Sequence, residues 1–480
     1  MRRFFVKNLL FVLTVNLLVK PVWIFMIDRT VQNRVGHASY GTYQALFNLG
    51  IIFQILLDFG LSYYNTKVIS QNPEKLKALF PGLLSARLVL VIIYAIIVSI
   101  IGLMAGYNSA ELLLLAGILL IQVFNSFIQF LRSNMAALHR FKADGLLSVT
   151  DRLLMIVICG FLLFWPATAA HFKIEWFVIT QICSYAIAVA LGFILLKKIS
   201  KVHLAISFDT RQVKEIIRSG LPYATLIFFM AIHTRADTVL LERLSPDGKV
   251  QAGIYAAAYR LLDVGNMFGL MFAGMLLPIF GRMLVQNQDV HPIIKLCVNI
   301  MLPVALMLSV ASFYFGSEVM QMLYTEATAE DGKVFALLMA CFPAYCMMYI
   351  YSTLLTANGN LRLLNKIAIA GVIINLTLNS ILIPRYQAAG AAFTAFITQT
   401  TLAFCFMLFS GKNIELPRTG KWIMAHISFL LLIAVLGYVF SLIPVDWKVQ
   451  VVAFGFTGLI LLFVFRFVSA NAIRKLVESK

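Results

Sequence analysis

Residues 375–395 read NLTLNSILIPRYQAAGAAFTA. The first half is apolar except for Asn375 and Asn379, one helical turn apart, and it runs to Pro384. The second half restarts on Gly390 and a run of alanines. We expect one helix to end at Pro384, which lacks a backbone donor, and Gly390 to let a second helix approach closely. Spacing of four places both asparagines on one helix face, where they can bond to a neighbouring helix. The stretch therefore predicts a helical hairpin inside a membrane.

The composition of the whole chain agrees with this prediction. Of 480 residues, 61% are hydrophobic and 12% are charged, whereas soluble domains are about 45–50% apolar and about 25% charged. Apolar stretches of about 20 residues, enough to cross about 30 Å of hydrocarbon as a helix, recur throughout. We predict an all-α polytopic membrane protein with about fourteen transmembrane helices. The expected spans are 8–27, 41–64, 82–105, 111–131, 148–166, 176–196, 219–241, 252–280, 293–315, 334–356, 365–384, 389–410, 422–443 and 449–468.

The net charge of +18 needs an explanation. Lysines and arginines concentrate in alternate loops, including 197–218 and the two ends of the chain, while the intervening loops carry few. This asymmetry is the positive-inside pattern, and it predicts that both termini are cytoplasmic. The basic balance is therefore explained by topology and attraction to anionic lipid headgroups, and it does not indicate a nucleic-acid partner.

A weak internal repeat suggests two lobes. GTYQALFNL at 41–49 and GIYAAAYRL at 253–261 share Gly, Tyr, Ala and Leu in register. A repeat six spans apart keeps its orientation in the membrane, as in transporters built from two parallel lobes. We predict an N-terminal lobe at 1–200, a cytoplasmic connector at 201–218, a C-terminal lobe at 219–411, and two additional spans with a tail at 412–480. The lobes would hold spans one to six and seven to twelve.

Charged residues inside spans are costly to place and are candidates for function. Lys20, Arg235 and Arg260 lie at similar depth on spans one, seven and eight, where three cations would repel one another unless a water-filled cavity received an anion. Guanidinium groups suit phosphate because their planar fork binds it bidentately. As an alternative, Asp237 and Asp263 could neutralise the two arginines as structural pairs.

Other charges lie nearer the ends of spans. Arg87 and Arg152, like Lys295 and Arg466, lie near cytoplasmic ends and can extend to the headgroups; alternatively, the first two line a cytoplasmic entrance. Asp58 is expected at a helix end as a gate residue or, as an alternative, a proton or cation site.

Further polar side chains are expected to join helices or to line the cavity: Asn16, Gln44, Asn48, Gln54, Asn125, Gln129, Asn134, Asn375, Asn379 and Gln399.

The remaining reactive residues predict neither catalysis nor a metal site. The six cysteines lie in apolar spans without metal-ligand spacing and are expected to be packing residues: Cys159, Cys183, Cys297, Cys341, Cys346 and Cys405. No catalytic constellation or phosphate loop can be placed, so we predict that the protein is not an enzyme and needs no cofactor.

Several motifs resemble one family. The hairpin at 375–395, with its Asn-x-x-x-Asn helix, Pro-x-Tyr turn and Gly-Ala-Ala start, resembles that of bacterial polysaccharide and oligosaccharide flippases of the Wzx type. These belong to the multidrug/oligosaccharidyl-lipid/polysaccharide exporter superfamily. DFGLS at 58–62, RADTVLL at 235–241, AGIYAAAYRL at 252–261 and LLTANGN at 354–360 are also similar to that family. Many relatives carry glycine where this chain has Gln387.

The resemblance implies a flippase for undecaprenyl-diphosphate-linked oligosaccharide repeat units in the bacterial inner membrane, working by alternating access. It would serve O-antigen, capsule or exopolysaccharide synthesis, with a polymerase and a chain-length regulator as possible partners. Lys20, Arg235 and Arg260 would bind the diphosphate, and Arg87 and Arg152 would admit it. Asp237, Asp263 and Asp58 are candidates for coupling to H⁺ or Na⁺.

Three alternatives remain at this point. A lipid II flippase would use the same chemistry. A cation-coupled multidrug exporter would favour an acidic, aromatic cavity over three cations. A membrane glycosyl polymerase generally needs a sizeable outer loop with polar catalytic groups, and the longest outer loop expected here, about 316–333, is short.

Overall fold

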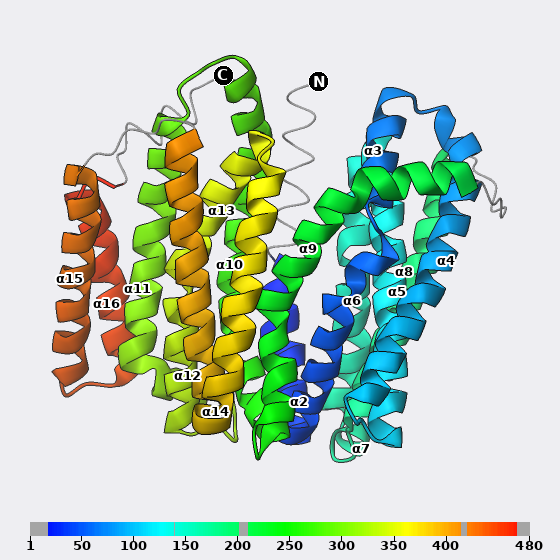
Figure 1. Ribbon diagram of the computed structural model, residues 1–480. Helices are drawn as coiled ribbons and strands as arrows, with labels where there is room; N and C mark the ends of the chain where they lie inside the picture. Colours follow the sequence, from blue (N-terminus) through cyan, green and yellow to red (C-terminus); the bar gives the residue numbers. More distant parts are fainter. Residues whose placement is uncertain (1–17, 139, 201–209, 414–419, 468–480) are drawn as a thin grey trace. The chain divides into compact units, whose positions relative to one another are not determined.

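The computed structural model describes residues 18–138, 140–200, 210–413 and 420–467, and these residues form helices and no strands. Eleven helices among them are long and apolar enough to cross a membrane. The chain divides into two compact units, Met1–Glu242 and Arg243–Lys480. The predicted all-α polytopic class is confirmed (Figure 1).

The first unit begins with a helical hairpin and continues through long apolar helices. Its elements are η1 (Trp23–Asp28), α2 (Arg29–Ile52), η2 (Gln54–Leu57), α3 (Leu61–Gln71), α4 (Lys75–Met104), α5 (Ser109–Ala137), α6 (Phe141–Phe164), α7 (Pro166–Ala169), α8 (Ile174–Ser200) and α9 (Thr210–Leu244). Helix α5 starts with a capping box, in which Asn108 and Glu111 each bond to the other's backbone. Such boxes satisfy amide donors that a helix start leaves unpaired.

The turn between the first two spans is much shorter than expected. The sequence predicted a loop over about 28–40, but helix continues on both sides of Gly36, whose φ of 77° and ψ of 167° make the turn. Asp28 is therefore buried inside the hairpin and accepts a hydrogen bond from the Tyr40 hydroxyl at 2.7 Å. Only glycine adopts this backbone conformation readily, which allows so tight a turn.

The second span is broken in its middle. Helix α2 ends at Ile52, a short 3-10 turn follows, and α3 starts after Phe59 and Gly60, which have φ of 44° and 84°. The sequence predicted one unbroken span over 41–64, and this prediction is wrong at the break.

The second unit contains the remaining spans. Its elements are α10 (Gly248–Val285), α11 (His291–Leu323), α12 (Ala329–Ala340), α13 (Phe342–Ala357), α14 (Leu361–Asn413), α15 (Gly420–Leu442) and α16 (Trp447–Val464). Helices α12 and α13 together form the span predicted at 334–356. A break at Cys341 precedes Pro343, as expected where a proline begins a new helical segment.

Helix α14 is the hairpin predicted from residues 375–395, and its two arms appear in yellow and orange in Figure 1. The turn falls at Gln387, with φ of 52° and ψ of −131°, so the first arm continues past Pro384. The expected helix end at Pro384 is thus wrong by a few residues. A Cβ on Gly390 would lie 2.5 Å from the Leu382 carbonyl oxygen. This confirms that Gly390 permits a close approach.

The two asparagines of this hairpin are fully buried, and Nδ2 of the Asn379 side chain donates to Asn375 Oδ1 at 3.2 Å. The turn itself is tied to α10, because the Ala388 amide donates to Gln251 Oε1 at 3.1 Å. The hairpin is therefore a packed structural element of the second unit.

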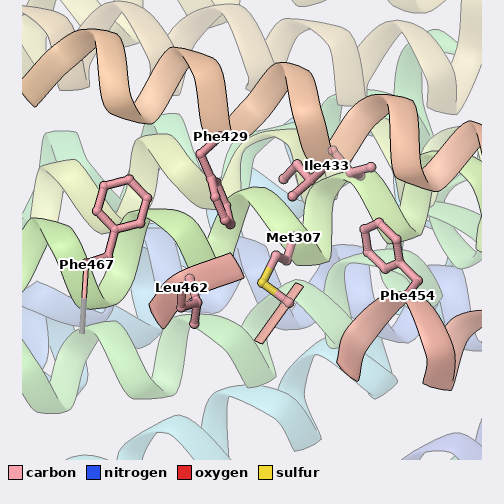
Figure 2. Close-up of a cluster of buried hydrophobic side chains, with 7 residues drawn as sticks. Met307, Phe429, Ile433, Phe454, Leu462 and Phe467 are labelled. Carbon is pink, nitrogen blue, oxygen red and sulfur yellow. The ribbon is translucent and has the colours of Figure 1, made fainter. Parts of the chain in front are cut away.

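Helices α15 and α16 pack against α11 through a separate apolar cluster. Figure 2 shows Met307 of α11 among side chains of the two last helices, including Phe429 and Phe454. Polar contact adds to the packing, since the Trp422 indole donates to Asn299 Oδ1 at 2.6 Å. The two additional spans predicted at the C-terminal end are therefore present.

Several predictions extend beyond the described residues. Half of the first expected span, including Asn16, lies in 1–17, half of the connector in 201–209, and the tail in 468–480, all outside the described residues. Residues 210–218 of the connector belong to α9. The compact units divide after Glu242, whereas the sequence places lobes at 1–200 and 219–411, and the lobe assignment remains a prediction.

Candidate functional site

The broken second span places a charged cluster inside the first unit. Asp58 follows the 3-10 turn, and its carboxylate pairs with the guanidinium of Arg87 on α4. The same carboxylate accepts from the Ser62 hydroxyl at 2.5 Å. Arg87 also donates to the carbonyl and the hydroxyl of Ser126 on α5, at 3.0 and 2.5 Å, and lies 4.6 Å over the Phe130 ring. Helices α3, α4 and α5 therefore meet at one ion pair.

The two partners of this pair differ in exposure. The Arg87 side chain is 1% exposed and that of Asp58 is 31% exposed. The expectation that Arg87 extends to the headgroups is therefore wrong, because its guanidinium is buried and bonded to Asp58, Ser62 and Ser126. Asp58 follows the 3-10 turn at a break inside the second span, whereas the sequence placed it near the inner end of that span, and its role as a gate residue stays a prediction.

The exposed side of Asp58 faces a cavity of about 320 Å³ within the first unit. Gln54, Ser62, Ser126 and Gln129 supply the rest of its polar lining, and isoleucines with Ala231 of α9 supply the apolar lining. Phe53 at the break packs against Phe228 of α9, with ring centroids 5.7 Å apart. Small-ligand sites in proteins have volumes of roughly 300–1,000 Å³, and the cavity is at the lower end of this range.

A second group of charges surrounds Arg152 on α6. Its guanidinium lies 5.1 Å over the Trp23 ring and 5.7 Å over the Tyr185 ring, and 3.5 Å from the carboxylate of neighbouring Asp151. The side chain remains 28% exposed. Stacking on aromatic faces holds a guanidinium in place without occupying its donors.

Lys20, from the first span, lies within electrostatic range of both Arg152 and Arg132. Arg132 on α5 donates to Asp144 Oδ1 at 2.7 Å and to Gln129 Oε1 at 3.4 Å. Three cations from three helices of the first unit thus interact electrostatically, and Asp144 and Asp151 lie beside the two arginines. The structure brings Lys20 together with Arg152, which the sequence assigned to the entrance.

The remaining predicted site residues lie on α9 and α10. Asp237 is 1% exposed, and Arg235 lies two residues before it on the same helix. Arg260 Nη1 lies 3.9 Å from Asp263 Oδ2, one helical turn away, with both side chains about one fifth exposed. This contact matches the structural-pair alternative for Arg260.

Sequence reasoning missed Arg132, Ser62, Ser126 and the two rings around Arg152. Serines in apolar spans are common, and only the break brings Ser62 beside Asp58. Gln54 and Gln129 were among the expected polar side chains, but nothing in their spacing indicated that they share a cavity. Within the described residues, no group of three His, Cys, Asp or Glu side chains could hold a metal ion.

Solved structures share this arrangement of helices. The chain aligns over 100% of its length with 100% of "Lipid II flippase MurJ, inward closed conformation", with a TM-score of 0.70 and 15% identity. It aligns over 84% with 94% of an inward-facing multidrug resistance MATE family transporter of the MOP superfamily, with a TM-score of 0.62 and 15% identity. The chain therefore shares the fold of these two proteins.

The family follows from the sequence comparison. Residues 5–284 match the family described as "Polysaccharide biosynthesis protein", and the chain belongs to that family. It is also 22% identical over 211 residues to "Capsular polysaccharide biosynthesis protein CapF" of Staphylococcus aureus, a match covering 42% of this chain and 52% of the relative. The chain thus matches about half the length of that curated relative. The resemblance noted from the motifs is confirmed.

Proposed function

We propose that the protein translocates a polyprenyl-diphosphate-linked oligosaccharide from the inner to the outer leaflet of a bacterial inner membrane. The observation that carries the proposal is the gathering of Lys20, Arg132 and Arg152 inside a chain with a transporter fold. Cations at membrane depth are costly unless an anion or an acid compensates them. A lipid diphosphate supplies such an anion.

The aromatic support of Arg152 favours this assignment. Arg152 stacks on Trp23 and Tyr185, and a guanidinium suits a diphosphate because its planar fork can bind phosphate oxygens bidentately. Lys20 adds a mobile point charge. Arg235 and Arg260 remain proposed diphosphate ligands, although the contact between Arg260 and Asp263 means that Arg260 would exchange partners when substrate binds.

Alternating access requires that substrate bind one state more tightly than another. We infer that the occluded state brings the proposed cations closest to the diphosphate. Coupling to H⁺ or Na⁺ through Asp237, Asp263 or Asp58 belongs to the same proposal. Asp58 and Asp263 each lie beside an arginine, so a coupling ion at either would have to release that arginine.

The family description and the relative from Staphylococcus aureus support a role in surface polysaccharide synthesis, with a polymerase and a chain-length regulator as further proposed partners. A lipid II substrate is the second candidate, supported by the fold shared with MurJ. Both candidates carry a diphosphate, so the cation group serves either.

Reconstitution in liposomes tests the proposal. Fluorescent polyprenyl-diphosphate oligosaccharide is placed in both leaflets, and its transfer is measured by quenching of the outer leaflet. We expect wild type to exceed empty liposomes and Arg152→Ala to lose most transfer. Arg152→Lys should recover little, because lysine lacks the planar fork. The combined Arg235→Ala, Arg260→Ala variant should also lose transfer.

Lys333→Ala is the matched control, because this cation is 65% exposed and pairs only with Glu330 one turn away among the described residues. Surface pairs of this kind contribute about 0–1 kcal/mol, so its transfer should equal that of wild type. Wild type indistinguishable from empty liposomes would overturn the flippase function. Cation variants that transfer as wild type does would overturn the diphosphate site.

A further inference from the structure

We propose that the cavity at the broken second span binds the sugar ring attached to the diphosphate, an inference that rests on the proposed function. Non-helical backbone at membrane depth is tolerated only where protein buries it or where it lines a cavity. Here the break at residues 53–60 does line one, and discontinuous helices commonly form substrate sites in transporters.

The chemistry of the lining matches a neutral polyhydroxyl ligand. Among the described residues of the lining, Asp58 is the only one with an acidic or basic side chain, and it pairs with the buried guanidinium of Arg87. The carboxylate is left as a hydrogen-bond acceptor at the wall. A second anion would meet this acceptor without a free cation, and a metal cation would have to displace the buried guanidinium. A sugar hydroxyl can donate a hydrogen bond to the carboxylate, and this requires neither a further cation nor displacement of the Arg87 guanidinium.

Two glutamines complete the recognition surface. Gln54 belongs to the 3-10 turn and lines the cavity, and in the described part of the chain no side-chain hydrogen bond occupies it. Gln129 accepts from Arg132 with Oε1. Gln129 also lines the cavity, where its Nε2 can donate to a ligand. An amide offers both donors and acceptors, as hydroxyl recognition requires, while Ile51, Ile55 and Ile227 can contact the C–H face of a ring.

The volume of the cavity indicates that it holds a single sugar ring, and its position indicates which ring of the oligosaccharide that is. Gln129 lines the cavity and also contacts Arg132, which lies within electrostatic range of Lys20 beside Arg152. The sugar site and the cation group are therefore adjacent within one unit. A volume of about 320 Å³ suits a small ligand rather than a chain of sugars. Because the sugar site lies beside the proposed diphosphate site, we assign the cavity to the ring nearest the diphosphate.

Binding to purified full-length protein tests the inference. The probes are polyprenyl diphosphate without sugar and the same lipid bearing one glucose, galactose or N-acetylglucosamine. We expect wild type to bind at least one sugar-bearing probe about fivefold or more tightly than the bare lipid, as one or two net hydrogen bonds would give. Gln54→Leu should abolish this preference and leave affinity for the bare lipid unchanged.

Controls separate the sugar site from the diphosphate site. Gln286→Leu makes the same change at an exposed glutamine after α10 and should alter neither affinity. Arg152→Ala should weaken all probes alike. If every sugar-bearing probe binds wild type as the bare lipid does, or if Gln54→Leu keeps the preference, the sugar site is overturned. If Arg152→Ala leaves all affinities unchanged while the sugar preference persists, the diphosphate site fails and the sugar site stands.

Discussion

The ion pair between Arg87 and Asp58 shows how unequal exposure decides the cost of a substitution. Arg87 is fully buried among Asp58, Ser62 and Ser126, whereas Asp58 opens onto the cavity. Removing one partner of a buried pair costs about 3–5 kcal/mol when the charge left behind is buried. A carboxylate left at a cavity wall retains water and costs less.

We therefore predict that Asp58→Asn lowers the melting temperature in detergent more than Arg87→Met does. Asp58→Asn leaves the buried Arg87 guanidinium without a counter-charge, and the free energy of unfolding is expected to fall by about 3 kcal/mol. The double variant should be more stable than Asp58→Asn alone, because no unpaired charge remains. Melting curves of the four proteins form a double-mutant cycle; strictly additive losses would show that the two side chains are not coupled.

Among elements, the hairpin of α14 depends on one residue in an unfavourable backbone conformation. The angles at Gln387, φ of 52° and ψ of −131°, are close to those of the first central position of a type II′ turn. Glycine is favoured there, since a Cβ is crowded at positive φ.

Gln387→Gly is accordingly expected to stabilise the protein by about 1 kcal/mol, read as a rise in melting temperature. Gln387→Ala is the matched control, because it removes the same side chain beyond Cβ but keeps the steric conflict. The alanine variant should not gain. An equal gain in both variants would mean that the glutamine side chain, rather than its backbone, is the source of strain.

The broken second span is the element on which the candidate site depends. The interruption at 53–60 ends at a glycine, Gly60, but the sequence on both sides was predicted as one helix over 41–64. Asp58, which lies within this break, was identified as a candidate from its charge alone. Its serine and arginine partners come from α3, α4 and α5 and could not be assembled from spacing.

For the whole molecule, the distribution of Lys and Arg predicts an orientation that can be measured. With both termini cytoplasmic, Arg385 in the α14 turn is outside, and Arg362 at the start of α14 is inside. In a background whose native cysteines are replaced by alanine or serine, a membrane-impermeant maleimide added to intact cells should label Arg385→Cys and not Arg362→Cys. Labelling of only the second variant would invert the predicted topology.

The sequence by itself determined the class of molecule and its family, because the bilayer demands long apolar helices and because the hairpin motifs are local. Residues 375–395 illustrate this: burial of both asparagines and the close approach at Gly390 followed from helical spacing and side-chain size. Only the turn position was displaced, because the first arm continues past Pro384 and the chain turns at Gln387.

The tertiary structure alone decided which charges meet. It buried Arg87 against Asp58, set Arg152 between Trp23 and Tyr185, and brought Arg132 and Lys20 into the same group. These residues are far apart in the chain, and helical periodicity states which face a side chain occupies but not which helix that face meets. Electrostatic energy depends on the distance between charges, and that distance exists only once the helices are packed.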